Sequence, residues 1–233
     1  MCGRYTVVAD GYELTEHLKA RWRSARMAAP RFNIAPTQHA PVLLREEGED
    51  VLDMYRWGLI PGWAKDPAIG NRMINARAET VREKPAFRSA FERRRCLVPA
   101  TGFYEWQKAG ARKVPHWIHP ADGAILTLAG LWERWSPENA EPVYTYTILT
   151  TGANRFMQGL HERMPVIIAP EEREQWLDPG AKPDDLVPLL DPAPEGLLAA
   201  HPVSTLVNAP GNDLPDCIEP VGAGVEGKGD KAE

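Results

Sequence analysis

Apolar residues recur with two different periods along the chain, and the change of period separates the expected helices from the expected strands. Leu14, Leu18 and Trp22 follow one another at four-residue spacing, the repeat of one face of an α-helix. The segment DGYE just before them carries the two acidic residues of a capping box. This pattern predicts an amphipathic helix over residues 11–23.

Short runs rich in β-branched and aromatic residues follow, and such runs are typical of strands. PVLLR and VLDMYRW flank the turn-like EEGED and predict a hairpin, and WGLIPGW after them predicts a loop. Five further runs are separated by turn-like segments and predict a meander: CLVPA, GFYEWQ, VPHWIHP, AILTLAGLWERW and VYTYTILTT.

Short helices are expected around these strands. Pro85 suits the first turn of a helix over residues 85–94. Strands without regularly alternating long helices favour an α+β fold. We therefore expect an α+β protein with a curved, barrel-like mixed or antiparallel β-sheet core and peripheral short helices. The remaining expected elements are helices at 153–159, 171–177 and 184–190, and strands at PVIIA and HPVSTLV.

Composition fits one domain with one core. The chain has 233 residues, of which 43% are hydrophobic and 25% charged, and residues 2–221 contain no linker-like segment. The last residues, 222–233 (GAGVEGKGDKAE), cannot bury apolar surface and are expected to form a disordered tail. The chain start lacks the layout of a secretory signal, and no apolar run approaches the roughly 18 residues that span a bilayer. We expect a cytoplasmic monomer with no membrane contact.

The cysteines and histidines predict neither a disulfide framework nor a metal site. Cys2, Cys96 and Cys217 are widely spaced and odd in number. His116 and His119 lie three residues apart on an expected strand, which places them on opposite faces. We expect free thiols, no metal and no cofactor.

Charge is distributed unevenly along the chain. The net charge of −5 argues against a nucleic-acid partner. Residues 72–95, however, contain eight basic and three acidic residues, whereas residues 170–195 contain eight acidic and two basic ones. Two interpretations remain open: one basic face on an acidic molecule, or ordinary solvated helix faces.

Cys2 has a chemical property that no internal cysteine shares. After removal of Met1 it would present an α-amine and a thiol on adjacent carbons, a pair that condenses with an aldehyde to an imine and then a thiazolidine ring. An α-amine with its usual pKa is roughly 30% neutral near pH 7.4, against about 0.1% for a lysine. Its position alone favours an incidental second residue, kept because a small side chain permits removal of Met1.

The surroundings of Cys2 carry a family resemblance. Eight segments occur in order between Cys2 and about Val221: MCGRYT, RFNIAP, WGLIPGW, INARAET, RCLVPATGFYEW, AGLWE, LHERMP and HPVS. Together they resemble the SOS-response-associated peptidase (SRAP) family, whose members process abasic sites in DNA. The combination of motifs is specific.

The resemblance implies that Cys2 bonds covalently to the open-chain aldehyde of an abasic site in single-stranded DNA, which shields the lesion as a DNA–protein crosslink. Asn75, Glu105 and His161 match the family's other catalytic positions. Glu105 would act as general acid and base, and His161 would protonate the sugar ring oxygen. Asn75 would hydrogen-bond the Cys2 groups without competing for their protons.

The same resemblance implies a set of DNA contacts. Arginines next to the catalytic positions would hold phosphates, and an apolar wedge with an aromatic face would replace the stacking lost at the missing base. HPVS and the threonine and glutamate of INARAET are expected to support the site. The implied DNA-binding residues are Arg4, Asn33, Pro36, Trp63, Arg77, Thr150 and Arg163.

Two other functions are compatible with the residues. The first is a thiol peptidase or hydrolase in which Cys2 attacks peptides, with self-removal of Met1 as its mildest form. The second is a non-catalytic reader of modified or single-stranded DNA that uses the basic stretch and Trp63. The motifs instead favour an enzyme in which Cys2 reacts with abasic DNA by lyase-like imine chemistry.

Overall fold

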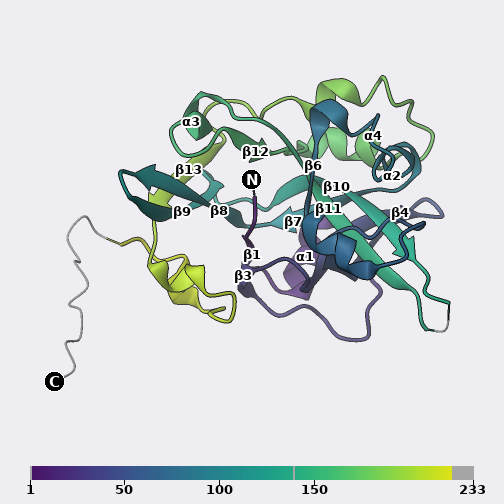
Figure 1. Cartoon of the computed structure of the whole chain (residues 1–233), viewed down its shortest axis with the longest axis horizontal. Coiled ribbons are helices and arrows are strands. Elements are labelled where there is room, and N and C mark those ends of the chain that lie inside the picture. Colours follow the sequence, from purple (N-terminus) through teal and green to yellow (C-terminus); the bar gives the residue numbers. More distant parts are fainter. Residues whose placement is uncertain (1, 139, 222–233) are drawn as a thin grey trace.

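The strands of the protein form two sheets that meet at the first strand of the chain (Figure 1). The computed structural model describes residues 2–138 and 140–221. The strands are β1 (Tyr5–Val7), β2 (Arg21–Trp22), β3 (Arg31–Ile34), β4 (His39–Glu46), β5 (Glu49–Trp57), β6 (Asn75–Arg77), β7 (Arg95–Ala100), β8 (Gly102–Ala109), β9 (Arg112–Pro120), β10 (Leu126–Trp135), β11 (Val143–Gly152), β12 (Arg163–Pro165) and β13 (Leu198–Pro202).

Five strands close into a barrel. They pair in the order β11-β10-β7-β4-β5, and β5 returns to β11 through a short parallel pairing. β11 also pairs with β6 in parallel and with β12 in antiparallel orientation. β2 pairs with β5 in parallel. The other five strands form an antiparallel sheet in the order β13-β9-β8-β1-β3. The expected α+β, barrel-like class is therefore confirmed.

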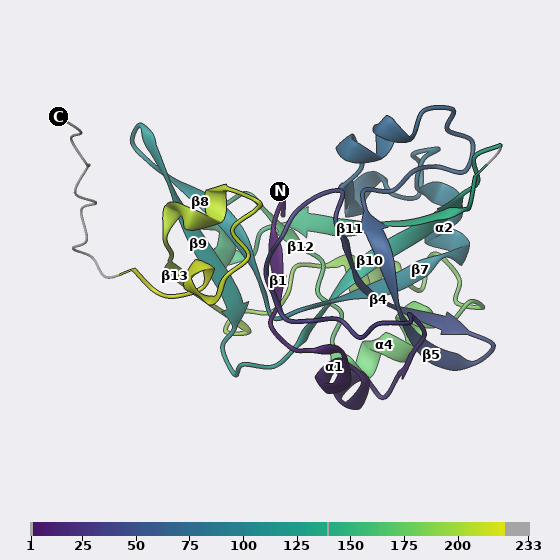
Figure 2. The same cartoon turned by 90° about the horizontal axis from the view of Figure 1, so that it is seen from below.

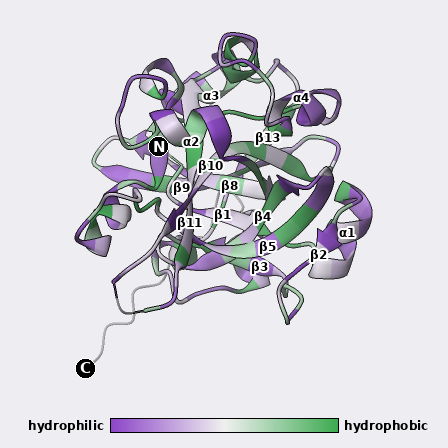
Figure 3. Ribbon diagram, turned by 90° about the vertical axis from the view of Figure 1, so that its right-hand side faces the viewer, coloured by the Kyte–Doolittle hydropathy of each residue, from purple (hydrophilic) through white to green (hydrophobic). Residues whose placement is uncertain are grey.

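β1 lies between the barrel and the strands β8, β9 and β13 of the second sheet. Figure 2 shows it running with β8, β9 and β13 on one side and β4, β5, β10 and β11 on the other. Tyr5 of β1 joins the two halves, since its hydroxyl lies 2.5 Å from that of Tyr146 on β11 and its ring packs edge-on against Trp57, 5.2 Å between centroids. All three side chains are buried. The core is continuous through this aromatic cluster, and Figure 3 shows hydrophobic stretches along β4 and β10.

The helices are shorter than the sequence predicts. The α-helices are α1 (Gly11–Leu18), α2 (Arg88–Arg93), α3 (Arg155–Gln158) and α4 (Arg173–Leu177), and the 3₁₀ segments are η1 (Pro67–Arg72), η2 (Ala78–Thr80), η3 (Pro170–Glu172), η4 (Val187–Leu190), η5 (Thr205–Asn208) and η6 (Pro215–Cys217).

α1 begins where the sequence predicts and ends early. The capping box between Asp10 and Glu13 is formed. The expected continuation to residue 23 is wrong, because Lys19 adopts a left-handed conformation that ends the helix. Trp22 belongs instead to β2, which pairs in parallel with β5.

Three other expectations need correction. The expected meander is wrong: β8 and β9 form a hairpin in the second sheet, while β7 pairs with β10 and β4 in the barrel. In HPVSTLV the strand ends at Pro202, and Ser204 caps a 3₁₀ turn through the amide of Leu206. In PVIIA only Pro165 lies in a strand, and Ile167 forms an isolated bridge with Leu128.

Two further expectations concern the extent of the chain. The tail predicted at 222–233 lies outside the described residues, and the single domain over 2–221 stays a prediction. Among the helices that the structure describes, none is both long and apolar enough to cross a membrane.

Candidate active site

Cys2 is placed by the strand that follows it. β1 pairs antiparallel with β8, with Tyr5 opposite Phe103 and the amide of Tyr104 donating to the carbonyl of Arg4 at 3.0 Å. This register brings Glu105, two residues beyond Phe103, to the same end of the strand pair as Cys2. Cys2 is fully buried, and its Sγ lies 3.7 Å from the carbonyl oxygen of Arg4.

Asn75 contacts Cys2 directly. Its Nδ2 donates to the carbonyl oxygen of Cys2 at 2.8 Å. Asn75 is the first residue of β6, opposite Ile148 of β11. Its Oδ1 is buried and has no hydrogen-bond partner among the residues that the structure describes. The amide is therefore fixed at its donor end and keeps acceptor capacity inside the site.

The segment that carries Asn75 is held by the WGLIPGW loop. The indole Nε1 of Trp57 donates to the carbonyl of Ile74 at 2.9 Å, and the amide of Leu59 donates to that of Met73 at 3.1 Å. Gly58 has a φ of +118°, and a Cβ there would lie 2.5 Å from the carbonyl oxygen of Gly70. The close approach of these two glycines lets the loop pack against η1.

Glu105 and His161 face one another at the site. The His161 Nε2 lies 4.0 Å from Glu105 Oε2, and Glu105 is only 3% exposed. The Nδ1 of His161 accepts from the backbone amide of Arg163 at 3.0 Å. The same Nδ1 lies 3.3 Å from the carbonyl oxygen of Arg163, so both backbone groups of Arg163 hold this side of the ring, and Nε2 is the nitrogen that faces Glu105.

Burial determines which protonation state the Glu105 carboxyl and the Cys2 thiol prefer. Burial raises the pKa of the Glu105 carboxyl, and the neighbouring His161 opposes that shift. Burial also raises the pKa of the Cys2 thiol far above its usual range, and the charge of Glu105 adds to the effect. Both groups hold their protons more tightly than in water, so that Cys2 carries a neutral thiol in this state.

The four predicted catalytic residues thus come together from four distant segments: the chain before β1, β6, β8 and the turn before β12. A buried carboxyl with a raised pKa beside an imidazole can move protons on and off a reacting nitrogen, oxygen or sulfur. The arrangement therefore suits acid–base chemistry at Cys2.

Arg4 and Asn33, both predicted to bind DNA, contact each other. The guanidinium of Arg4 donates to Asn33 Oδ1 at 2.8 Å and to the carbonyl of Val207 at 2.7 Å. Asn33 is fully buried, and its Nδ2 donates to the carbonyls of Val207, Ala209 and Asn212. Asn33 therefore holds residues 207–212 close to Arg4, the residue just before β1.

Thr150, Arg77 and Arg163 form a second group. Thr150 is buried on β11 and lies opposite both Arg77 of β6 and Pro165 of β12. Arg163 donates to the Thr150 carbonyl at 2.6 Å and forms a bidentate ion pair with Glu79. Arg77 is exposed. In the described structure, then, Arg163 is engaged internally while the Arg77 side chain faces solvent.

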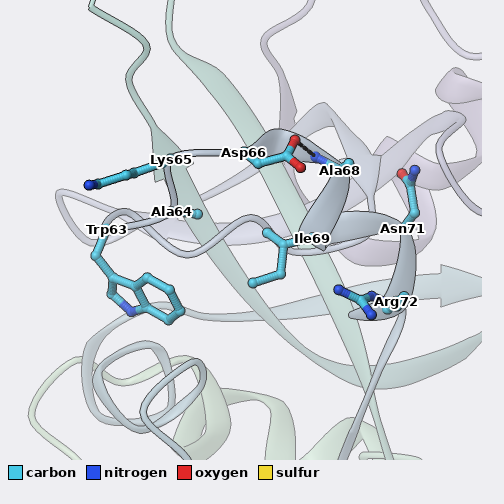
Figure 4. A pocket seen from close by; sticks show the side chains of 8 residues that line it. All are labelled: Trp63, Ala64, Lys65, Asp66, Ala68, Ile69, Asn71 and Arg72. Carbon is cyan, nitrogen blue, oxygen red and sulfur yellow. Dashed lines mark hydrogen bonds between the residues drawn. The ribbon is translucent and has the colours of Figure 1, made fainter.

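Trp63 and Pro36 lie outside these groups. Trp63 is 63% exposed and borders a hollow of about 510 Å³. Figure 4 shows Ile69 between Trp63 and Arg72, with Asp66 accepting a hydrogen bond from the amide of Ala68. Pro36 is half-buried. The DNA contacts of Trp63 and Pro36 stay predictions.

Several members of the basic stretch are already partnered. Arg95 is 6% exposed and donates to four backbone carbonyls, those of Phe91, Glu92, Trp176 and Asp178. Arg94 pairs with Glu133, and Arg82 pairs with Asp184 of the acidic stretch. The other members of the stretch, Arg72, Arg77, Lys84, Arg88 and Arg93, are exposed, as is Arg82, so the two interpretations that the sequence left open both stay open.

Within residues 2–138 and 140–221, no group of three or more His, Cys, Asp or Glu side chains could hold a metal ion. All three cysteines are buried and free. Trp57 is a supporting residue that the sequence interpretation missed. A tryptophan at the end of an apolar strand needs a partner for its indole N–H when buried, and that requirement was the available signal.

The fold and the site define a barrel-like α+β protein with a cysteine-centred acid–base site. Comparison with known families identifies it further: the profile of the SOS response associated peptidase (SRAP) family matches residues 1–210. The chain belongs to this family, and the expectation from the sequence motifs is confirmed.

Individual relatives agree. The chain is 40% identical over 222 residues to the abasic site processing protein YoqW of Bacillus subtilis (strain 168), covering 94% of this chain and 99% of that protein. It is 34% identical over 268 residues to the abasic site processing protein HMCES of Gallus gallus, covering 97% and 79%. A crystal structure of a protein from Bacteroides thetaiotaomicron superposes with a TM-score of 0.86 at 28% identity, covering 94% and 100%.

Proposed function

We propose that this protein processes abasic sites by forming a covalent crosslink between Cys2, as the N-terminal residue after removal of Met1, and the ring-opened sugar in single-stranded DNA. The observation that carries the proposal is the convergence of Asn75, Glu105 and His161 on Cys2. The relatives named abasic site processing proteins support the choice of substrate.

The proposed reaction releases one water. The α-amine of Cys2 adds to the aldehyde of the opened sugar, and the resulting carbinolamine loses water to give an imine. The Cys2 thiol then adds to the imine carbon, and its proton passes to the nitrogen as the five-membered thiazolidine closes. This adduct shields the lesion during replication or the SOS response.

Each neighbouring residue has a role in these steps. Glu105 takes and returns the protons of the amine, the carbinolamine and the thiol, which suits a carboxyl whose pKa burial has raised. His161 donates the proton that opens the sugar ring. Asn75 holds the Cys2 carbonyl and offers its free Oδ1 to a hydroxyl of the adduct.

The proposed DNA contacts are assigned to side chains that are exposed to solvent, and the buried residues are given supporting roles. Arg77 and Trp63 reach solvent and are proposed to hold a phosphate and an unstacked base. Asn33 and Thr150 are buried. We propose that Asn33 supports DNA binding by holding Arg4 in place, and that Thr150 helps to hold Arg163, whose guanidinium is engaged within the protein. The monomeric state and the cytoplasmic location remain expectations from the sequence.

The test is a crosslinking assay with single-stranded DNA that carries one abasic site. Wild-type protein, shown by intact mass to lack Met1, should give a band that survives denaturing electrophoresis. Cys2→Ala keeps the amine but not the thiol and should give no stable band. Cys96→Ala, which removes a buried thiol of β7 in the barrel, is the matched control and should crosslink normally.

Other outcomes would favour other functions. Retained Met1 or an undiminished band with Cys2→Ala would contradict thiazolidine formation. Reversible, salt-sensitive DNA binding that persists in Cys2→Ala without any wild-type crosslink would indicate a non-catalytic reader. Reaction of the thiol with peptides but not with abasic DNA would indicate a peptidase.

A further inference from the structure

The ion pair between Glu79 and Arg163 joins the two segments that supply Asn75 and His161. Both terminal nitrogens of Arg163 donate to the Glu79 carboxylate, Nη1 to Oε1 and Nη2 to Oε2, the second at 2.9 Å. Glu79 lies on η2, four residues after Asn75, and Arg163 lies two residues after His161. A bidentate arginine–carboxylate pair fixes orientation as well as distance.

The pair bridges across a strand. β6 and β12 both pair with β11 at Thr150, which lies opposite Arg77 and Pro165. Arg163 also donates to the Thr150 carbonyl oxygen at 2.6 Å. Its guanidinium therefore contacts the strand between the two segments and the carboxylate beyond it, which locks the three together.

Arg163 in turn holds the imidazole. Its backbone amide donates to His161 Nδ1 at 3.0 Å, and this hydrogen bond directs His161 Nε2 toward Glu105. The Arg163 side chain is only 15% exposed, whereas that of Glu79 is 51% exposed. The hydrogen bond from Arg163 lowers the pKa of Glu79, so the carboxylate is charged at neutral pH.

We propose that Glu79 is a positioning residue for the reaction at Cys2: through Arg163 it holds His161 and Asn75 in register with each other. The proposal deepens the proposed function and rests on it for the activity readout. Glu79 touches no reacting atom in this scheme. Its removal should slow the chemical step rather than weaken DNA binding.

Glu79→Gln tests this, with crosslinking measured at saturating abasic DNA and DNA affinity measured separately on a stable abasic-site analogue. The expected rate is about 10-fold lower, within the ~100-fold that a 1 Å misplacement can cost, with affinity changed less than about twofold. Glu79→Asp keeps the charge and should recover part of the rate. The single variant Arg163→Met and the double variant Glu79→Gln/Arg163→Met complete the set. Because the two residues are coupled and their effects are not additive, the double variant should be no slower than Arg163→Met alone.

The chain provides a matched control. Arg45 and Glu174 form another bidentate pair, at 2.7 Å for both hydrogen bonds, between β4 and α4, which carry no site residue. Glu174→Gln removes an equivalent carboxylate and should leave the rate unchanged. An equal loss in Glu174→Gln, an additive double variant, or a Glu79→Gln effect confined to affinity would each overturn the proposal.

A second readout is independent of crosslinking. The ¹⁵N chemical shifts of the His161 imidazole report which ring nitrogen is protonated, and they should change in Glu79→Gln and not in Glu174→Gln. If Glu79→Gln is too unstable for the assay, the same chemical shifts can be measured in Glu79→Asp. Unchanged shifts would refute the positioning role, whereas a wild-type protein that never crosslinks would refute the proposed function alone.

Discussion

The side-chain amide of Asn75 donates to the backbone carbonyl of Cys2 at 2.8 Å. The hydrogen bond ties the start of β6 to the residue just before β1, which are 73 positions apart in the chain. Only a donor can make it, since the Cys2 carbonyl accepts and cannot donate.

Asn75→Asp should therefore be more harmful than its size suggests. The substitution replaces the donor by a carboxylate oxygen that faces the carbonyl, and it leaves the Cys2 carbonyl unpaired at a cost of about 1–3 kcal/mol. We expect lower stability in urea denaturation and a crosslinking rate reduced at least tenfold. Asn71→Asp, at an exposed asparagine, is the control; equal losses in both variants would contradict a specific role of Asn75.

Glu105→Gln should stabilise the protein while abolishing fast crosslinking. Burial raises the pKa of Glu105, so the folded state prefers the protonated form, and the native carboxyl loses stability as pH rises through that pKa. The neutral amide avoids this loss. Thermal denaturation at pH 7 should show a gain on the order of 1 kcal/mol, typical of relieving a functional site.

The stability difference between Glu105→Gln and wild type should shrink below about pH 4, where the carboxyl is protonated in both the folded and unfolded protein. A gain that does not depend on pH would show that packing, and not ionisation, causes it. Crosslinking by the variant at the wild-type rate would exclude Glu105 as the general acid and base.

Trp57→Phe should affect the site from a distance. Phenylalanine keeps an aromatic ring against Tyr5 and removes the indole donor to the carbonyl of Ile74, at a cost of about 1–3 kcal/mol for the unpaired carbonyl. We expect a lower unfolding midpoint and slower crosslinking through the displaced Asn75. Trp176→Phe, which removes another buried indole donor, to Cys96, should be destabilised without a comparable loss of rate at temperatures where both variants are folded.

Arg77→Gln should weaken DNA binding without slowing the chemistry at saturation. Arg77 is exposed, and a lost phosphate contact should reduce the slope of log affinity against log salt by about 1. Fluorescence anisotropy at several salt concentrations measures this slope. Arg112→Gln, at the tip of the β8–β9 hairpin, is the control and should leave the slope unchanged.

Local signals in the sequence were reliable where the structure depends on neighbours in the chain. The capping box at Asp10 predicted the start of α1 because its hydrogen bonds span three residues. The end of α1 could not be predicted in the same way, because Trp22 is drawn into β2 by pairing with Leu52 of β5. The meander failed for the same reason: adjacent strands β7 and β8 belong to different sheets.

The site divides in a similar way. The motifs supplied Cys2, Asn75, Glu105 and His161 through resemblance to a family. The motif INARAET also led us to expect that Glu79 supports the site, but the contacts of Glu79, like those of Trp57, join segments that are far apart in the sequence, and others depend on a loop conformation such as that of Gly58. The pattern of residues along the chain does not reveal contacts of this kind.

β1 has a mechanical consequence for a protein joined to DNA. Cys2 lies at the end of a strand that is hydrogen-bonded on both edges, to β8 and to β3. Under the proposed function, a force that pulls on the attached DNA acts on Cys2 and loads these hydrogen bonds together along the strand, in shear. An enzyme that travels along the DNA and meets the adduct would have to draw a strand that is paired on both edges out of its sheet before the protein unfolds.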